Sequence, residues 1–187
     1  RMPLRRLEAE ELRDSLLFVS GQLDQTRFGP PEPVRVLPDG LVQSGKRRSV
    51  YVEQLRKHPP SLLESFDLPA MNPNCLQRQD SLVALQALHL LNDSVIRELA
   101  GRLADRTLSV AGDSRAQQIG RLYMTTLGRP PTAKEEAACV EALAKLTDQW
   151  SKSLAAAGTP APQEAQRKAF TTVCHTMMNS AMFLYID

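Results

Sequence analysis

Apolar residues recur at helical spacing along most of this chain. Four of them between Leu12 and Leu23 lie three or four positions apart, which places them on one face of a helix. Glutamates at the start of this stretch favour a helix, because carboxylates interact well with the positive end of the helix dipole. We therefore predict an amphipathic helix over residues 7–23, ended by Gly21 and the proline-rich stretch 29–33.

Two short stretches of strand-forming residues follow this first helix. Residues 34–37 and 49–53 are rich in β-branched and aromatic side chains, and Asp39-Gly40 between them is a turn signal. The pattern predicts a small antiparallel β-hairpin within residues 34–53. So short a hairpin is not stable alone, so it must pack on helices.

From Pro59 onward the pattern is helical. The fold class that follows is mainly α, an irregular multi-helix bundle with one small antiparallel β-hairpin near residues 34–53. Short turns between the later helices favour antiparallel packing of neighbours. The predicted helices cover residues 60–66, 80–91, 94–108, 114–128, 133–157 and 163–183. We expect a single domain over residues 1–187, divided into a leading helix with a proline-rich loop (1–33), the hairpin (34–58) and the bundle (59–187).

The composition is consistent with one hydrophobic core and gives no indication of a nucleic-acid partner or of a membrane-spanning segment. The chain has 187 residues, of which 42% are apolar, enough for one core. Its 23 basic and 21 acidic residues give a net charge of +2, which does not indicate a nucleic-acid partner. No apolar run approaches the roughly 20 residues that span a bilayer.

The cysteines do not form a recognisable site. Cys75, Cys139 and Cys174 are widely spaced and make no CxxC or CxxCH motif, so the sequence predicts neither a zinc site nor covalent haem attachment. We expect buried thiols. A disulfide between two of the three stays open if the compartment is oxidising.

Histidine, serine and glycine patterns also predict no reaction. His58, His89 and His175 are not at ligand spacing, and a structural role is the simpler interpretation for His89 and for the Cys174-His175 pair. The chain has no nucleophile elbow and no glycine-rich phosphate loop. We therefore predict no catalytic residue, no metal site and no cofactor in this chain.

The middle third combines apolar residues with an unusual set of polar ones. If Asp67 is buried between Phe66 and Leu68 it needs a partner, because an unpaired buried charge is costly. We predict that an arginine of the middle third neutralises it, chosen from Arg47, Arg48, Arg56 and Arg78. This centre is either a structural latch or an anion or ligand pocket, and its candidate binding residues are Arg48, Tyr51, Asp67, Cys75, Arg78, Gln86 and Asn92.

Five ordered motifs carry a family resemblance. RRSVYV, SFDLPAMNPNC, LQALHLLND, LYMTTLGRPPT and MNSAMFLYID resemble the C-terminal domain of planctomycete cytochrome-c-associated proteins, the PSD-type domain of unknown function number fifteen fifty-three. The resemblance covers nearly the whole chain. One departure is Leu85, where many members carry proline, which should leave the helix around Gln86 more regular here.

The resemblance implies a setting more than an activity. It suggests the C-terminal part of a longer exported protein of the periplasm or cell envelope, in which any haem belongs to other domains. The first hypothesis is a non-catalytic scaffold or interaction domain that docks its own N-terminal part or a cytochrome c module. The alternative is a ligand-binding or hydrolytic module acting on polysaccharide, with a polar site around Arg48, Asp67 and Arg78.

Overall fold

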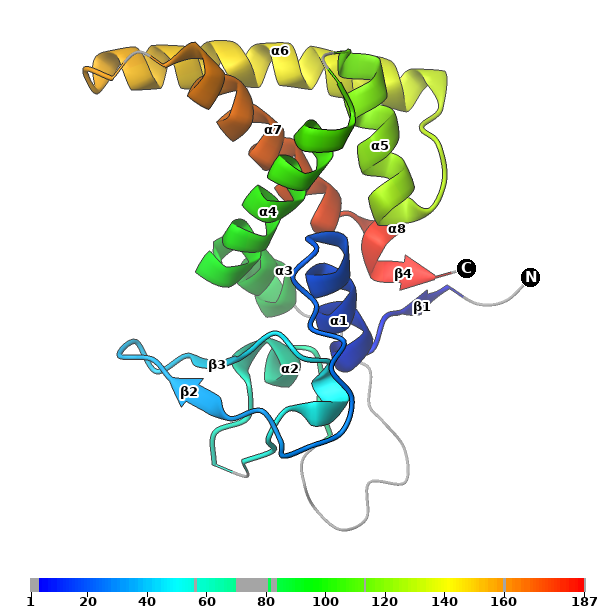
Figure 1. The fold of residues 1–187 in the computed structure, drawn as a ribbon, viewed down its shortest axis with the longest axis vertical. Helices are drawn as coiled ribbons and strands as arrows, with labels where there is room; N and C mark the ends of the chain where they lie inside the picture. Colours follow the sequence, from blue (N-terminus) through cyan, green and yellow to red (C-terminus); the bar gives the residue numbers. More distant parts are fainter. Residues whose placement is uncertain are drawn as a thin grey trace.

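The computed structural model describes residues 4–55, 57–69, 81, 84–112, 114–159 and 161–186. Within these residues the fold is mainly helical, with eight α-helices, one 3-10 turn and two small antiparallel sheets of two strands each (Figure 1). The predicted fold class is confirmed. No helix in the described part of the chain is long and apolar enough to cross a membrane.

The first helix is shorter than predicted. Helix α1 spans Ala9–Val19 and begins with a capping box, in which Glu8 and Glu11 each bond the other's backbone N–H. Leu12 and Leu16 on its inner face are fully buried. The chain leaves the helix at Gly21, whose φ of 72° is a left-handed conformation that favours glycine.

The predicted hairpin exists, but its second strand was assigned wrongly. Strand β2 (Val34–Val36) pairs with β3 (Val42–Ser44), with Val34 opposite Ser44. Residues 49–53 are not that strand, because Ser49–Tyr51 forms the 3-10 turn η1. The backbone N–H and the hydroxyl of Ser49 both donate to Asp14 Oδ1 at 2.7 Å. These contacts with α1 outweigh the strand propensity of the sequence.

Three helices form the middle of the chain: α2 (Ser61–Ser65), α3 (Ala84–Asn92) and α4 (Ser94–Val110). Asp93 caps α4 by accepting a hydrogen bond from Val95 N at 2.6 Å, as the predicted break at residues 92–94 requires. The predicted start of α3 near Asp80 lies outside the described residues.

The last four helices build the larger part of the bundle. They are α5 (Arg115–Leu127), α6 (Ala133–Ala156), α7 (Pro162–Met178) and α8 (Ala181–Leu184). Helix α6 crosses one end of the molecule, and α7 returns from it to pack against α4 (Figure 1). The prediction of one continuous helix over residues 163–183 is wrong, because two helices cover this range. The helical run breaks at Asn179, whose N–H closes the last turn on His175 and Thr176 carbonyls, and α8 follows.

A second sheet joins the two ends of the chain, which the sequence did not predict. Strand β1 (Arg5–Arg6) pairs antiparallel with β4 (Tyr185–Ile186), and Leu7 N donates to Leu184 O at 2.8 Å. The two ends of the ribbon therefore lie beside each other (Figure 1). Two-residue strands are too short to leave a periodic pattern.

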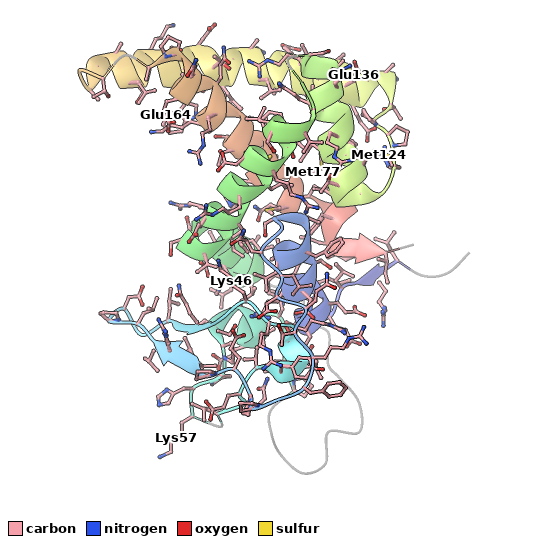
Figure 2. All side chains as sticks on the ribbon, in the orientation of Figure 1. Lys46, Lys57, Met124, Glu136, Glu164 and Met177 are labelled. Carbon is pink, nitrogen blue, oxygen red and sulfur yellow. The ribbon has the colours of Figure 1, made fainter. Side chains whose placement is uncertain are left out.

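One cluster of buried apolar side chains draws on every helix. Met177 of α7, labelled in Figure 2, belongs to it and is 5% exposed. Burial of each large aliphatic side chain contributes about 1.5–3 kcal/mol. Every helix supplies at least one member of this cluster. In the order α1 to α8, examples are Leu12, Leu63, Leu90, Ile96, Ile119, Leu143, Phe170 and Phe183.

Candidate functional site

The polar centre of the chain closes around Asp67. This residue follows α2 in a left-handed conformation, with φ of 65°, one of two such non-glycine residues in the described chain. Its carboxylate accepts a hydrogen bond from Arg6 Nη2 at 2.8 Å. It also accepts from the N–H of Ser81 at 2.8 Å and from its hydroxyl at 2.6 Å.

Gln86 of α3 completes this arrangement. Its Oε1 accepts from Arg6 Nη1 at 2.6 Å, and its Nε2 donates to the carbonyl oxygen of Ser81 at 3.2 Å. Arg6 also donates to that carbonyl and lies over the Phe66 ring, 5.4 Å from its centroid. We call Arg6, Asp67, Ser81 and Gln86 the Arg6 cluster.

The predicted pairing of Asp67 with an arginine is right, but the arginine was not foreseen. The partner is Arg6 of β1, 61 residues away, and neither Arg47 nor Arg48 supplies the ion pair. Arg56 and Arg78 lie outside the described residues. No local signal marks Arg6, because β1 places it beside Asp67 only after pairing with β4.

Electrostatics favour the ionised form of Asp67. The Arg6 side chain is 8% exposed and that of Asp67 is 23% exposed. Burial raises the pKa of the Asp67 carboxyl, but hydrogen bonds from Ser81 and Arg6 outweigh it, so the pKa lies below its ordinary value. The cluster therefore holds a charged pair whose hydrogen bonds join its own members.

A second buried arginine fastens the hairpin to α1. Arg13 is 5% exposed and donates to the backbone carbonyls of Gly45 at 2.6 Å and Arg47 at 2.9 Å, and to the hydroxyls of Ser44 and Ser49. Burial lowers the pKa of its guanidinium, and Asp14 partly opposes that shift. The helical pattern of α1 could not predict that Arg13 binds the hairpin, since an arginine beside an apolar face usually extends its guanidinium to water.

The other predicted residues near the hairpin have distinct roles. Arg47 donates to the carbonyls of Thr26, Phe28 and Pro30, and its guanidinium lies 4.4 Å from the centroid of the Tyr51 ring. These contacts hold the proline-rich loop in place. Tyr51 and Arg47 are thus structural partners.

Arg48 faces an open cleft beside α1. Its side chain is 59% exposed, and its Nε lies 3.5 Å from Asp14 Oδ2. The cleft has a volume of about 810 Å³, and its lining also includes Glu10, Glu11 and Gln54. Of the predicted residues, Arg48 lines this cleft, whereas Asp67 and Gln86 lie in the Arg6 cluster.

Of the remaining predicted residues, the structure describes only Asn92, which does not join the Arg6 cluster. Asn92 is exposed at the end of α3, and Cys75 and Arg78 lie outside the described residues. Cys139 and Cys174 are free thiols, and burial raises the pKa of the Cys174 thiol. In the described residues no group of three or more His, Cys, Asp or Glu side chains is arranged to hold a metal ion.

Sequence reasoning missed a serine, histidine and aspartate in hydrogen-bond contact. Ser65 Oγ lies 3.0 Å from His89 Nδ1, and His89 Nε2 lies 3.0 Å from Asp93 Oδ2. Burial raises the pKa of Asp93, but bonds from His89 and Val95 N outweigh it and lower the pKa overall. The three residues connect α2, α3 and the start of α4.

This contact is built as a bridge between helices. The Ser65 hydroxyl also lies 2.8 Å from the Ser61 carbonyl, which competes for its single proton. Acyl transfer would also need backbone N–H groups free to bind an oxyanion. The N–H groups of Phe66 and Leu68, which follow the serine, already donate to carbonyls of α2. The structural role predicted for His89 agrees with this geometry.

Helix α3 turns leucines outward. Leu85, Leu88 and Leu91 are 63%, 52% and 49% exposed, whereas Gln86 and Leu90 on the opposite side are buried. These three residues, which we call the leucine row, span about 120° of the helix surface. Leu85 is the second residue of α3, in the first turn, where proline would also be tolerated, so the predicted greater regularity of this helix stays a prediction.

Comparison with known proteins gives a family and no activity. No curated protein and no solved structure matches this sequence. The family model PSD1, described as "Protein of unknown function (DUF1553)", matches residues 1–143. This match covers most of the chain and agrees with the resemblance carried by the motifs. The chain therefore belongs to the PSD1 (DUF1553) family of proteins of unknown function.

Proposed function

We propose that this chain is a non-catalytic scaffold or interaction domain of an exported, cytochrome-c-associated envelope protein. The observation that carries the proposal is the leucine row of α3. Exposed apolar side chains are common singly, but a row of three on one helix is typical of a surface that docks another polypeptide. Because α3 contains no aspartate, glutamate, lysine or arginine, a partner would meet an apolar surface.

The closed polar centre supports the same function. Asp67 and Gln86, two of the predicted binding residues, form hydrogen bonds with other members of the Arg6 cluster. A substrate would have to break these bonds to reach them, and each hydrogen bond to a charged group contributes about 1.5–3 kcal/mol. These side chains are better suited to fix α3 than to bind a ligand.

The proposed partner is the N-terminal part of the same protein. The family resemblance is the reason for this choice, and a cytochrome c module is the next partner to test. Any haem would then belong to another domain, and the complex would lie in the periplasm or cell envelope.

Site-specific cross-linking in the full-length protein tests the docking surface. A photo-reactive residue at Leu88 should cross-link to the N-terminal part, identified by mass spectrometry. Val110, which is 63% exposed at the end of α4, is the matched control position and should not give this product. Equal products from both positions, or cross-links only between two copies of the chain, would refute the proposal.

The cleft beside Arg48 favours a second function, a polysaccharide-binding or hydrolytic module. Carboxylates and an arginine around an open hollow suit a hydroxylated ligand, and 810 Å³ is within the usual range for ligand sites. Thermal-shift measurements with oligosaccharides would detect such binding. A rise in Tm that Arg48→Gln abolishes would favour this function, and no shift at millimolar ligand would exclude it.

A further inference from the structure

A second groove lies between α4 and α7, beside Trp150 of α6. Its volume is about 610 Å³, within the range of about 300–1,000 Å³ that small-molecule sites occupy. Helix α7 contributes polar residues from Arg167 to His175 to its lining, to which Trp150 of α6 also belongs. None of the predicted site residues that the structure describes lines it.

The groove is cationic. Four basic side chains and two carboxylates line it, a surplus of two positive charges that equals the formal net charge of +2 for the whole chain. The lining residues that carry these charges are Arg97, Arg102, Arg167, Lys168, Glu98 and Asp105. An anion is therefore the charge that this hollow favours.

Two of the four basic residues lack a carboxylate partner in the described part of the chain. Arg167 is held by Asp105 at 2.7 and 2.9 Å, and by Glu164, labelled in Figure 2, at 3.8 Å. Arg102 pairs with Glu98. By contrast, Arg97 donates to the Leu91 carbonyl, and Lys168 Nζ lies 5.1 Å from the centroid of the Trp150 ring.

The groove also presents neutral acceptors. The Thr171 hydroxyl donates to the Arg167 carbonyl, which leaves its lone pairs for a donor from outside. His175 Nε2 lies 3.0 Å from the Leu90 carbonyl, which can only accept. The proton therefore lies on Nε2, and in the neutral ring Nδ1 is an acceptor.

We propose that this groove binds a small polyhydroxylated anion, a sugar that carries a carboxylate or a sulfate or phosphate ester. Arg97 and Lys168 bind the anionic group, and Thr171 and His175 accept hydrogen bonds from hydroxyls. Gly101 leaves room along α4, since a Cβ there would meet only Arg167 Nη2, at 4.0 Å. This site is independent of the leucine row.

Tryptophan fluorescence is a direct readout, because Trp150 is the only tryptophan of the chain. Titration with glucuronate, glucose 6-sulfate or glucose 6-phosphate should change the fluorescence saturably as Lys168 turns from the ring to the anion. Glucose and inorganic sulfate should bind at least tenfold more weakly. Whichever charged sugar has the lowest Kd identifies the anionic group that the groove prefers. Equal affinity for glucose, or for inorganic sulfate, would overturn the proposal. The absence of a response to any charged sugar at about 10 mM, which corresponds to a binding free energy weaker than about 3 kcal/mol, would also overturn it.

Calorimetric titration of variants tests the residues without relying on the tryptophan. Lys168→Gln and Arg97→Gln should each weaken binding of the best sugar at least tenfold, and Gly101→Leu should block the groove. Lys134→Gln, an exposed charge change in the first turn of α6, is the matched control and should bind as the natural chain does. Equal losses in Lys134→Gln and Lys168→Gln would reduce the effect to net charge and refute the site. Circular dichroism verifies that each variant is folded.

Discussion

At the scale of single residues, the important polar side chains act across long separations in sequence. Arg6 reaches Asp67, and Arg13 reaches Ser49, 61 and 36 residues away. Burial predicted that Asp67 needs a cationic partner, and that prediction is right. The identity of the partner could not be predicted, because it depends on where β1 is placed by the opposite end of the chain.

Removing the charge of Asp67 should destabilise the fold. Asp67→Asn keeps the shape of the side chain but leaves Arg6 buried without its counter-charge, so we expect a loss of about 2–3 kcal/mol in the free energy of unfolding. Urea denaturation measures it, and Asp67→Ala should cost more, because alanine also tolerates the left-handed backbone conformation of this position less well than asparagine does. Glu141→Gln, which breaks an exposed pair with Lys145, should leave the free energy of unfolding nearly unchanged. A denaturation midpoint unchanged in Asp67→Asn would contradict the role of the Arg6 cluster.

The same carboxyl predicts a dependence on pH. Its pKa in the folded protein lies below its ordinary value, so the unfolded chain binds this proton first as the pH falls. The stabilisation is complete well above about pH 4, the ordinary pKa of aspartate, and is lost as the pH falls through the folded pKa. Urea midpoints measured from pH 6 to 3 should therefore converge for the natural chain and Asp67→Asn. If the difference between the two midpoints stays constant over this pH range, the charge of Asp67 does not contribute to the pH dependence of stability.

At the scale of elements, long amphipathic helices were predictable and short elements were not. Helices α4 to α6 agree with the pattern because their apolar stripes and caps act locally. The second hairpin strand was misplaced because Ser49 prefers contacts with α1, and the break after α7 was missed because the apolar pattern continues through it. Strands β1 and β4 have two residues each, too few for any periodicity.

The start of α6 offers a test of local stabilisation. Thr132 accepts from Glu135 N, and the Glu135 carboxylate accepts from Thr132 N at 2.7 Å and from Arg129 at 2.6 and 2.9 Å. Hydrogen bonds from Arg129 and Thr132 lower the pKa of Glu135 to about 2. Thr132→Ala should cost about 1 kcal/mol by thermal unfolding. Lys134→Ala, at an exposed position of the same turn, should cost much less. Equal effects would mean that the cap contributes little.

At the scale of the whole molecule, the fold class was predictable and the sites were only partly so. Arg48, Asp67 and Gln86 were identified as polar residues with specific roles, because charges and amides among apolar neighbours need partners. Ser81, Arg6 and the groove beside Trp150 were not. They depend on how helices distant in sequence pack together, which hydrophobic periodicity does not determine.

The pairing of the two chain ends predicts that the molecule tolerates circular permutation. A short linker from Ile186 to Arg5, with new ends at Thr159 between α6 and α7, should preserve the helical content and lower Tm by only a few degrees. Circular dichroism measures both. New ends within α7, after Phe170, should prevent folding because they divide the central helix. Failure of the first permutant, or equal success of the second, would contradict this architecture.

The antiparallel ladder between β1 and β4 also determines how the molecule responds to tension. Arg5 lies opposite Ile186, so a force pulling both chain ends apart acts at the open edge of the ladder and loads its backbone hydrogen bonds one after another. Such peeling needs less force than shearing all of them together. A pulling force on both ends would therefore separate β1 from β4 before any helix unfolds. Separation of β1 would also remove Arg6 from Asp67.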